Sequence, residues 1–207
     1  MSDKIGIIGY SGHAYVIIEA AKLLQHSIIG YYEKEKLPFN PYRLTYLGNE
    51  EEVDFKGSQN KYIIGIGNNR IRQKIAERLQ NHISFASIVH PNTLISETSK
   101  IGLGTFINAN VTINALATIG EHCILNTGCI IEHECCIDNY VHIGPGAVLA
   151  GNVQVCAGTF IGANVTVKQG IKIGHNVIIG AGTVVIRDIP DNVTIVGNPS
   201  KIIKNNG

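Results

Sequence analysis

The chain has 207 residues, of which 44% are hydrophobic and 16% charged, and its formal net charge at pH 7 is +1. This composition is typical of a globular protein with a buried core, and the near-neutral charge without a basic run excludes a surface built to follow nucleic-acid phosphates. No run of 18 apolar residues predicts a membrane span, and the N-terminus lacks the order of a signal peptide, so we expect a cytoplasmic protein.

The first part of the chain alternates short apolar runs with helical segments. Predicted strands cover 5–8, 27–32 and 62–66, and predicted helices cover 14–24 and 70–80. This alternation is typical of βαβ units with a parallel sheet. We therefore expect a small α/β, Rossmann-like subdomain over residues 1–87.

A glycine-rich turn, Gly9-Tyr10-Ser11-Gly12-His13, follows the first predicted strand. Such a turn places backbone N–H groups at a helix N-terminus, where they bind anions such as phosphate. A purely structural turn between strand and helix would have the same composition, so this segment alone leaves both interpretations open. The turn does not match GxGxxG, and a dinucleotide cofactor is therefore poorly supported.

A six-residue repeat dominates the rest of the chain. Every sixth residue from Val89 to Val185 is Ile, Leu or Val, without insertion or deletion. A period of six fits neither an amphipathic helix nor an exposed strand, but it fits a triangular coil whose three sides are one hexapeptide each. Residues 88–207 are therefore predicted to form a parallel β-helix with a C-terminal tail, and 89–190 correspond to between five and six coils of three hexapeptides each.

The five cysteines are interpreted from the same repeat. Cys123, Cys129 and Cys135 recur every six residues, as packing residues of the coil would, and no CxxC pair occurs. We therefore expect reduced thiols, no disulfide framework and no metal site.

One cluster in the repeat suggests catalysis. His133 lies between Glu132 and Glu134, and a carboxylate beside an imidazole raises its basicity and selects its tautomer. A His–carboxylate pair next to a thioester could deprotonate an amine acceptor. The alternatives are an exposed histidine among solvated glutamates, and a thiol nucleophile at Cys135 or Cys136, which the packing phase of the cysteines disfavours. His142, half a coil further on, could donate to a bound thioester or cap a turn.

Several motifs together resemble a known family. They are Gly-Tyr-Ser-Gly-His at 9–13, Ile-Gly-Asn-Asn at 66–69, Leu-Asn-Thr at 125–127, Ile-Glu-His-Glu-Cys at 131–135 and Val-Gly-Asn-Pro-Ser-Lys at 196–201. The chain resembles the bacterial sugar acetyltransferases that join a nucleotide-binding subdomain to a β-helix. These include the bacillosamine-pathway UDP-4-amino-sugar N-acetyltransferases, the perosamine N-acetyltransferases and sialic acid O-acetyltransferase-like proteins.

The resemblance implies a left-handed coil, acetyl-CoA as co-substrate, and a homotrimer with active sites between neighbouring prisms. It implies that His133 is the general base, that Glu134 raises its basicity and that Asn126 lies in the acceptor site. The implied nucleotide-sugar contacts are Ser11, Gly12, His13, Tyr32, Glu33 and Gly67. The implied acetyl-CoA contacts are His142, Ala163 and Ala181.

The resemblance also leaves alternatives. The preferred function is N-acetylation of a nucleotide-linked amino sugar for surface-glycan assembly. O-acetylation of a sugar such as sialic acid, or a non-catalytic scaffold, would suit the same pattern. Tyr32-Glu33 stands where bacillosamine-type enzymes carry acidic residues, and Asn-Pro-Ser-Lys replaces the usual Pro-Ala-Lys. The sugar, the choice between UDP and GDP, the acetylated ring position and the glutamate that pairs with His133 stay open.

Overall fold

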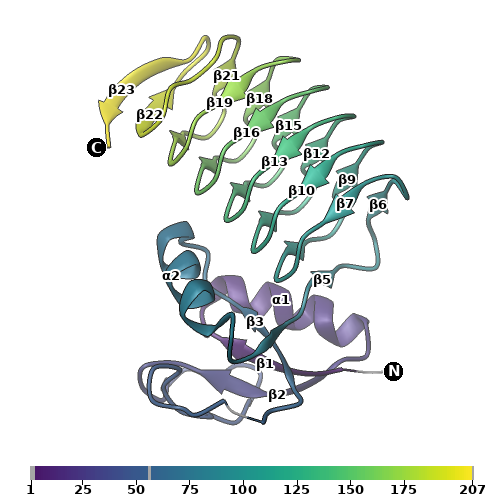
Figure 1. The fold of residues 1–207 in the computed structure, drawn as a ribbon, viewed down its shortest axis with the longest axis vertical. Coiled ribbons are helices and arrows are strands. Elements are labelled where there is room, and N and C mark those ends of the chain that lie inside the picture. Colours follow the sequence, from purple (N-terminus) through teal and green to yellow (C-terminus); the bar gives the residue numbers. More distant parts are fainter. Residues whose placement is uncertain (1–2, 56, 207) are drawn as a thin grey trace.

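The computed structural model describes residues 3–55 and 57–206, which form an α/β domain beside a long stack of triangular coils (Figure 1). The N-terminal sheet is parallel, with strand order β2-β1-β3-β4. Its elements are β1 (Lys4–Ile8), α1 (Gly12–Leu23), β2 (Ser27–Tyr32), β3 (Lys61–Ile64), α2 (Asn69–Leu79) and β4 (Ser84–Phe85). The predicted parallel α/β arrangement is confirmed.

Both helices begin earlier than the hydrophobic pattern predicts, and a polar residue precedes each of them, although only α2 has a side-chain cap hydrogen bond. Ser11 has an extended backbone and precedes α1, and the Asn68 side chain accepts a hydrogen bond from the Ile71 N–H at the start of α2. Helix α1 lies between the sheet and the β-helix, since one buried cluster joins its Ile17 to Ile5 of β1 and to Phe106 of the β-helix. Helix α2 packs on a different cluster of the same sheet.

The β-helix has three faces, made of two-residue strands except for the longer β22 and β23 at its C-terminal end. The eight-strand face consists of β5 (Ile88–Val89), β8 (Phe106–Ile107), β11 (Ile124–Leu125), β14 (His142–Ile143), β17 (Phe160–Ile161), β20 (Ile178–Ile179), β22 (Val193–Val196) and the antiparallel β23 (Lys201–Asn205). The six-strand face consists of β6 (Leu94–Ile95), β9 (Thr112–Ile113), β12 (Ile130–Ile131), β15 (Val148–Leu149), β18 (Thr166–Val167) and β21 (Val184–Val185). The five-strand face consists of β7 (Lys100–Ile101), β10 (Thr118–Ile119), β13 (Cys136–Ile137), β16 (Gln154–Val155) and β19 (Lys172–Ile173).

Strand register confirms the predicted coil of three hexapeptides. Ile119, for example, is paired with Ile137, and Leu125 with Ile143. The repeated aliphatic positions from Ile107 onward are buried inside this left-handed prism, and only Val89, Ile95 and Ile101 of the first coil are partly exposed. The first coil covers its core on one side only, so its side chains keep some contact with solvent.

The coil turns require a left-handed backbone at every sixth residue from Gly104 to Gly182. Three corners result. The corner next to His133, called the dyad corner below, contains Leu116, Glu134, Asn152 and Gly170. The corner that contacts the α/β domain, called the docking corner, contains Gly104, His122, Tyr140, Gly158 and Asn176. The third corner contains Asn110, Gly128, Gly146, Asn164 and Gly182. Glycine and asparagine tolerate this conformation, whereas other residues are strained by about 1–2 kcal/mol. Four of these corner positions carry other residues, Leu116, His122, Glu134 and Tyr140, and the last three recur in the contacts described below.

No helix in residues 3–55 and 57–206 has the length and apolar character needed to cross a membrane.

Candidate active site

His133 and Glu134 form a hydrogen-bonded pair on the dyad corner. The His133 Nδ1 atom lies 3.0 Å from Glu134 Oε2, and the two side chains are 51% and 57% exposed. Of the two flanking glutamates, Glu134 therefore makes this contact with the imidazole. A carboxylate at Nδ1 favours the tautomer that carries the proton there, which leaves the Nε2 lone pair free to accept a proton.

The His133 ring rests on the backbone of Gly151, one coil further along. A Cβ atom built on Gly151 would lie 2.5 Å from both Cε1 and Nε2 of the imidazole. No real Cβ approaches a ring so closely, so any side chain at this position would displace the imidazole. Gly151 was not predicted from the sequence, although its place one full coil after His133 is the signal that identifies it.

Glu33 lies next to the glycine-rich turn at the end of β2. Its Oε2 accepts a hydrogen bond from the Tyr10 N–H at 3.1 Å, and its Oε1 accepts one from the Lys34 N–H at 3.2 Å. A cavity of about 330 Å³ opens here, lined by Gly9, Glu33 and residues of α2. It lies at the carboxyl ends of parallel strands, where α/β proteins bind nucleotides. The structure thus brings Glu33 together with the glycine-rich turn.

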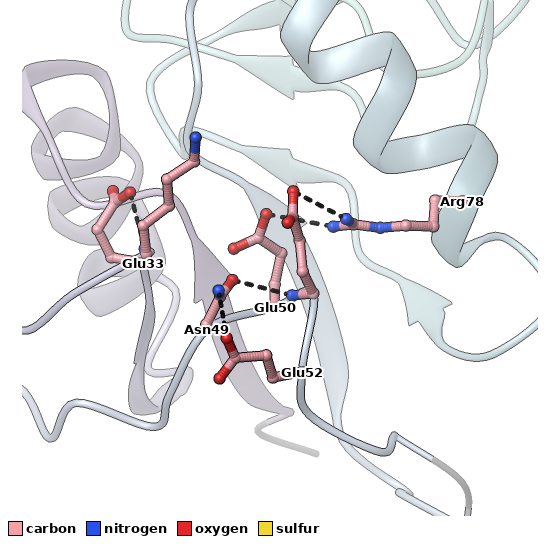
Figure 2. Close-up of polar contacts among 7 residues, drawn as sticks. Glu33, Asn49, Glu50, Glu52 and Arg78 are labelled. Carbon is pink, nitrogen blue, oxygen red and sulfur yellow. Dashed lines mark hydrogen bonds and ion pairs between the residues drawn. The ribbon is translucent and has the colours of Figure 1, made fainter.

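Glu50 and Glu51 also line this cavity, and neither was predicted from the sequence. Figure 2 shows Arg78 reaching from α2 toward Glu50, and its guanidinium pairs with Glu50 and with Glu51, each at 3.2 Å. Asn49 organises the same segment, because its Oδ1 accepts from the Glu51 N–H at 3.0 Å and its Nδ2 donates to Glu52 Oε1 at 3.3 Å (Figure 2). The run of acidic residues was the available signal, but the partner arginine lies far along the chain, on α2.

Tyr32 does not line the cavity in the way the family resemblance implies. Its side chain is 6% exposed and packs against Phe55 and Tyr62, with ring centroids 5.2 and 6.0 Å away. Successive residues of a strand face opposite sides, so the last residue of β2 turns into the core while Glu33 beyond it reaches the turn.

His13 and His142 meet where the α/β domain covers the eight-strand face. Their ring centroids are 6.2 Å apart, and His142 Nδ1–H donates to the Gly67 carbonyl at 3.3 Å. Burial, together with the nearby Arg72 charge, lowers the pKa of His142 to about 4; burial, with His142 and Arg72 adding to it, lowers the pKa of His13 to about 3. Both imidazoles are therefore neutral at pH 7, and three predicted site residues, His13, Gly67 and His142, lie together.

These buried neutral histidines predict loss of stability in mild acid. Burial likewise lowers the pKa of His122 to about 4. Because the folded-state pKa values lie below the unfolded value of about 6.5, the unfolded chain binds more protons. Stability is complete above pH 6.5 and falls as the pH approaches 4, by up to about 1.4 kcal/mol per pH unit for each histidine.

Urea midpoints between pH 8 and 4.5 measure this effect. The control variant His175→Gln, at an exposed histidine, should show the same dependence of the urea midpoint on pH as the wild type. In His142→Gln, the decrease of the midpoint in acid should be smaller by the contribution of one histidine. A midpoint that stays constant from pH 7 to 5 would contradict the prediction.

A larger cavity of about 640 Å³ lies beside His142. It is lined by the first turn of α2, by Phe160 and Ile178 of the eight-strand face, and by Lys204 of β23. Phe160 packs edge-on against His142 with ring centroids 5.0 Å apart, so the cavity adjoins the histidine pair. These three lining residues were not predicted from the sequence: the repeat gives Phe160 and Ile178 the same outward phase as solvent-facing positions, and Lys204 lies beyond the repeat, on β23.

Asn126, Ala163 and Ala181 lie along the third corner. Asn126 Oδ1 accepts hydrogen bonds from the Asn108 side chain and from the Thr127 N–H. Ala163 is half-buried and its carbonyl accepts from the Gly182 N–H, next to the exposed Ala181 one coil further on. In one chain these three residues are therefore on a different corner from the His133–Glu134 pair.

Three of the five cysteines occupy the packing positions expected from their phase, whereas Cys136 is exposed and Cys156 half-buried. Cys123, Cys129 and Cys135 are buried, and burial raises the pKa of the first two thiols to about 12 and that of Cys135 above its ordinary value. Thiols of this kind are poor nucleophiles. Across residues 3–55 and 57–206, no three His, Cys, Asp or Glu residues gather in a way that could hold a metal ion.

The β-helix of hexapeptide coils, with a His–carboxylate pair on one corner and an α/β domain docked on one face, is the arrangement of an acyltransferase of the hexapeptide-repeat class. Residues 4–79 match the model of the PglD N-terminal domain, and residues 83–179 match that of the GMPPB C-terminal domain. A 49-residue segment is 44% identical to the UDP-N-acetylbacillosamine N-acetyltransferase of Bacillus subtilis (strain 168), a match that covers 23% of each chain.

Solved structures match over nearly the whole chain. A histidine-to-asparagine variant of perosamine N-acetyltransferase from Caulobacter crescentus, in complex with CoA and GDP-perosamine, is 31% identical with a TM-score of 0.89, covering 98% of this chain and 97% of the other. The acetyltransferase domain of PglB from Neisseria gonorrhoeae FA1090, in complex with acetyl coenzyme A, is 30% identical with a TM-score of 0.90, covering 98% and 100%. The chain belongs to this family of bacterial sugar acetyltransferases, and it is an acetyltransferase.

Proposed function

We propose that this protein transfers the acetyl group of acetyl-CoA to the amine of a nucleotide-linked amino sugar of the 4-amino-4,6-dideoxy type. The observation that carries the proposal is the His133–Glu134 pair at 3.0 Å, held on a glycine and open to an acceptor. Acetyl-CoA is the acetyl donor, in keeping with the CoA or acetyl-CoA named for the two structural relatives. The amino-sugar acceptor is in keeping with the names of the perosamine and bacillosamine relatives.

His133 acts as the general base. Its Nε2 takes the proton that the amine nitrogen loses as this nitrogen attacks the thioester carbonyl. Backbone N–H groups stabilise the tetrahedral oxyanion. The carbon–sulfur bond then breaks, and the imidazolium returns the proton to the departing CoA thiolate. Glu134 stabilises the imidazolium while it exists, because its carboxylate is bonded to Nδ1.

The two domains divide the substrates. Residues 1–87 hold the nucleotide-sugar through the turn at Ser11, Gly12 and His13, with Glu33 and Gly67 nearby. Residues 88–207 carry the dyad and bind acetyl-CoA, with His142, Ala163 and Ala181 along its path and Asn126 toward the acceptor. The cavity of about 640 Å³ adjoins His142 and has room for part of an extended ligand.

The active site forms between protomers of a homotrimer. In one chain the dyad corner and the docking corner, which carries the α/β domain, are separated by a full side of the prism. A side of one hexapeptide spans roughly 20 Å at the rise of a β-strand. That separation is too large for His133 to reach an amine held by the α/β domain of its own chain, so the base comes from a neighbouring protomer.

The outward side chains of the β-helix agree with such an assembly. On the six-strand face they are uncharged and mostly apolar: Leu94, Thr112, Ile130, Val148, Thr166 and Val184. On the five-strand face they are Lys100, Thr118, Cys136, Gln154 and Lys172. An apolar stripe gains by burial against a partner, whereas a face with lysines remains stable in water. The six-strand face is therefore the interface side.

A thiol-release assay with acetyl-CoA tests the reaction against UDP-4-amino sugars, GDP-perosamine and free sialic acid. Release with an amino sugar alone supports N-acetylation and identifies the nucleotide. Release with sialic acid alone would contradict the amine acceptor and favour O-acetylation. No release with any acceptor while acetyl-CoA still binds would show that the acceptor is wrong, whereas no release together with no acetyl-CoA binding would favour a scaffold.

Mixed trimers test the shared site. His133→Asn lacks the base and Glu33→Lys disrupts the nucleotide cavity, so each homotrimer should be nearly inactive. Co-assembly in equal amounts should restore about a quarter of wild-type activity, because half of the cavities are intact and half of those face an intact base. If base and cavity belonged to one chain, mixing would restore nothing.

A further inference from the structure

Arg72 is a buried arginine on α2 that bridges the α/β domain and the β-helix. Its side chain is 1% exposed, and no carboxylate pairs with it among residues 3–55 and 57–206. A buried cation without an ion-pair partner is costly, so every N–H must find an acceptor. The described contacts show five: the carbonyls of His122 (2.8 Å), Tyr140 (3.0 Å), Ile66 and Gly67 (3.2 Å each), and Asn69 Oδ1 (2.8 Å).

On the β-helix side, these acceptors belong to successive coils of the docking corner. His122 and Tyr140 are one coil apart, and each presents its carbonyl to the same guanidinium. Asn69, which accepts from Arg72, donates to the carbonyls of Gly158 and Thr159 on the next coil, at 3.0 Å each. The first turn of α2 thus donates hydrogen bonds to three successive coils, and Figure 1 shows α2 beside the stacked turns.

The docking corner is adapted to this contact. Its two strained positions carry aromatic rings, and the His122 and Tyr140 rings stack with centroids 5.6 Å apart and planes 8° from parallel. Phe85 packs edge-on against His122 at 4.5 Å. The Arg72 side chain is buried at this corner, and exclusion of water strengthens the hydrogen bonds of its guanidinium and fixes their geometry.

On the α/β-domain side, Arg72 and His142 share one hydrogen-bond acceptor. The Gly67 carbonyl accepts from Arg72 Nη1 at 3.2 Å and from His142 Nδ1 at 3.3 Å. Arg72 therefore fixes the carbonyl that determines which nitrogen of His142 carries the proton. With Nδ1–H committed to Gly67, Nε2 of His142 is the acceptor nitrogen that remains for a ligand.

We propose that Arg72 is a positioning residue that couples the two substrate sites: its guanidinium holds residues 66–69 against the coils and, through the Gly67 carbonyl, sets the orientation and tautomer of the His142 imidazole. The proposal rests on the proposed function for its effect on catalysis. Lysine cannot replace the arginine, because its single ammonium has three donors and no planar fork to reach acceptors on both domains.

The wild-type protein provides the first test. In ¹⁵N-labelled protein at pH 7, the His142 side chain should be neutral with its proton on Nδ1. A proton on Nε2 would overturn the coupling through Gly67. This measurement needs no sugar substrate, so it remains decisive even if the proposed acceptor is wrong.

Variants provide the second test. Arg72→Lys and Arg72→Ala should weaken acetyl-CoA binding about 10-fold and lower kcat/KM for the sugar about 10-fold to 100-fold, because small displacements of reacting groups are costly. The matched control Arg43→Met replaces an exposed arginine outside both sites and should bind acetyl-CoA normally. Circular dichroism reports whether each variant keeps its fold.

Chemical rescue separates positioning from a merely structural role. Guanidinium or methylguanidinium at millimolar concentration should restore part of the acetyl-CoA affinity of Arg72→Ala and return the His142 proton to Nδ1, whereas ammonium should do neither. Folded Arg72→Lys and Arg72→Ala variants with unchanged acetyl-CoA affinity and an unchanged His142 tautomer would refute the proposal. Should neither variant fold, the wild-type tautomer still decides.

Discussion

A His133→Asn variant is expected to fold, to bind acetyl-CoA with wild-type affinity and to lose about 10²-fold to 10⁴-fold of kcat, the usual contribution of a positioned general base. Asparagine keeps much of the volume beside Gly151 but has no nitrogen that can take a proton at neutral pH. The half-exposed position of His133 explains why the fold should tolerate the change. Single-turnover rates at saturating acetyl-CoA measure the chemical step.

Two companions sharpen this test. Glu134→Gln should cost less than His133→Asn, because the amide keeps a hydrogen bond to Nδ1 but not the charge that stabilises the imidazolium. His175→Asn changes an exposed histidine elsewhere on the β-helix and should retain full activity. If His133→Asn retained more than a tenth of wild-type kcat, the assignment of His133 as the base would be wrong.

A Gly151→Ala variant is expected to lower kcat by about 10-fold to 100-fold while the KM for acetyl-CoA changes little. The added methyl would lie 2.5 Å from two atoms of the His133 ring, so the imidazole must rotate or shift away from the acceptor. The exposed ring has free space to move into, and the protein should therefore remain folded. The kinetic signature is a lost transition-state interaction with ground-state binding preserved.

Gly170→Asn is the matched control for Gly151→Ala. It adds a side chain on the same corner, where a Cβ meets nothing within 4 Å, and asparagine already occupies the equivalent turn position at Asn152. The double variant His133→Asn/Gly151→Ala should be no slower than His133→Asn alone, because both changes act through one imidazole. Additive losses would show that Gly151 acts in some other way.

The local part of the site was predictable because its residues are neighbours in the chain. His133 and Glu134 are adjacent, so the pairing of imidazole and carboxylate needs only the turn between β12 and β13. The glycine-rich turn was predictable from its place between a strand and a helix, and Glu33 was expected beside it from the family resemblance. Tyr32, one residue earlier, was placed at the site by resemblance, and the alternation of β2 turns its side chain into the core instead.

By itself, the sequence determined the β-helix, its inner core and the packing role of Cys123, Cys129 and Cys135. A strict period of six fits a triangular coil with one hexapeptide on each side, and this coil turns every repeated aliphatic residue into the core. Only the tertiary structure decided where the α/β domain lies, which corner it contacts through Arg72 and Asn69, and which outward residues line the cavity beside His142. These contacts join residues 50 to 90 positions apart, and a hydrogen bond from a buried guanidinium to a backbone carbonyl depends on the fold and leaves no residue-type pattern at its acceptor.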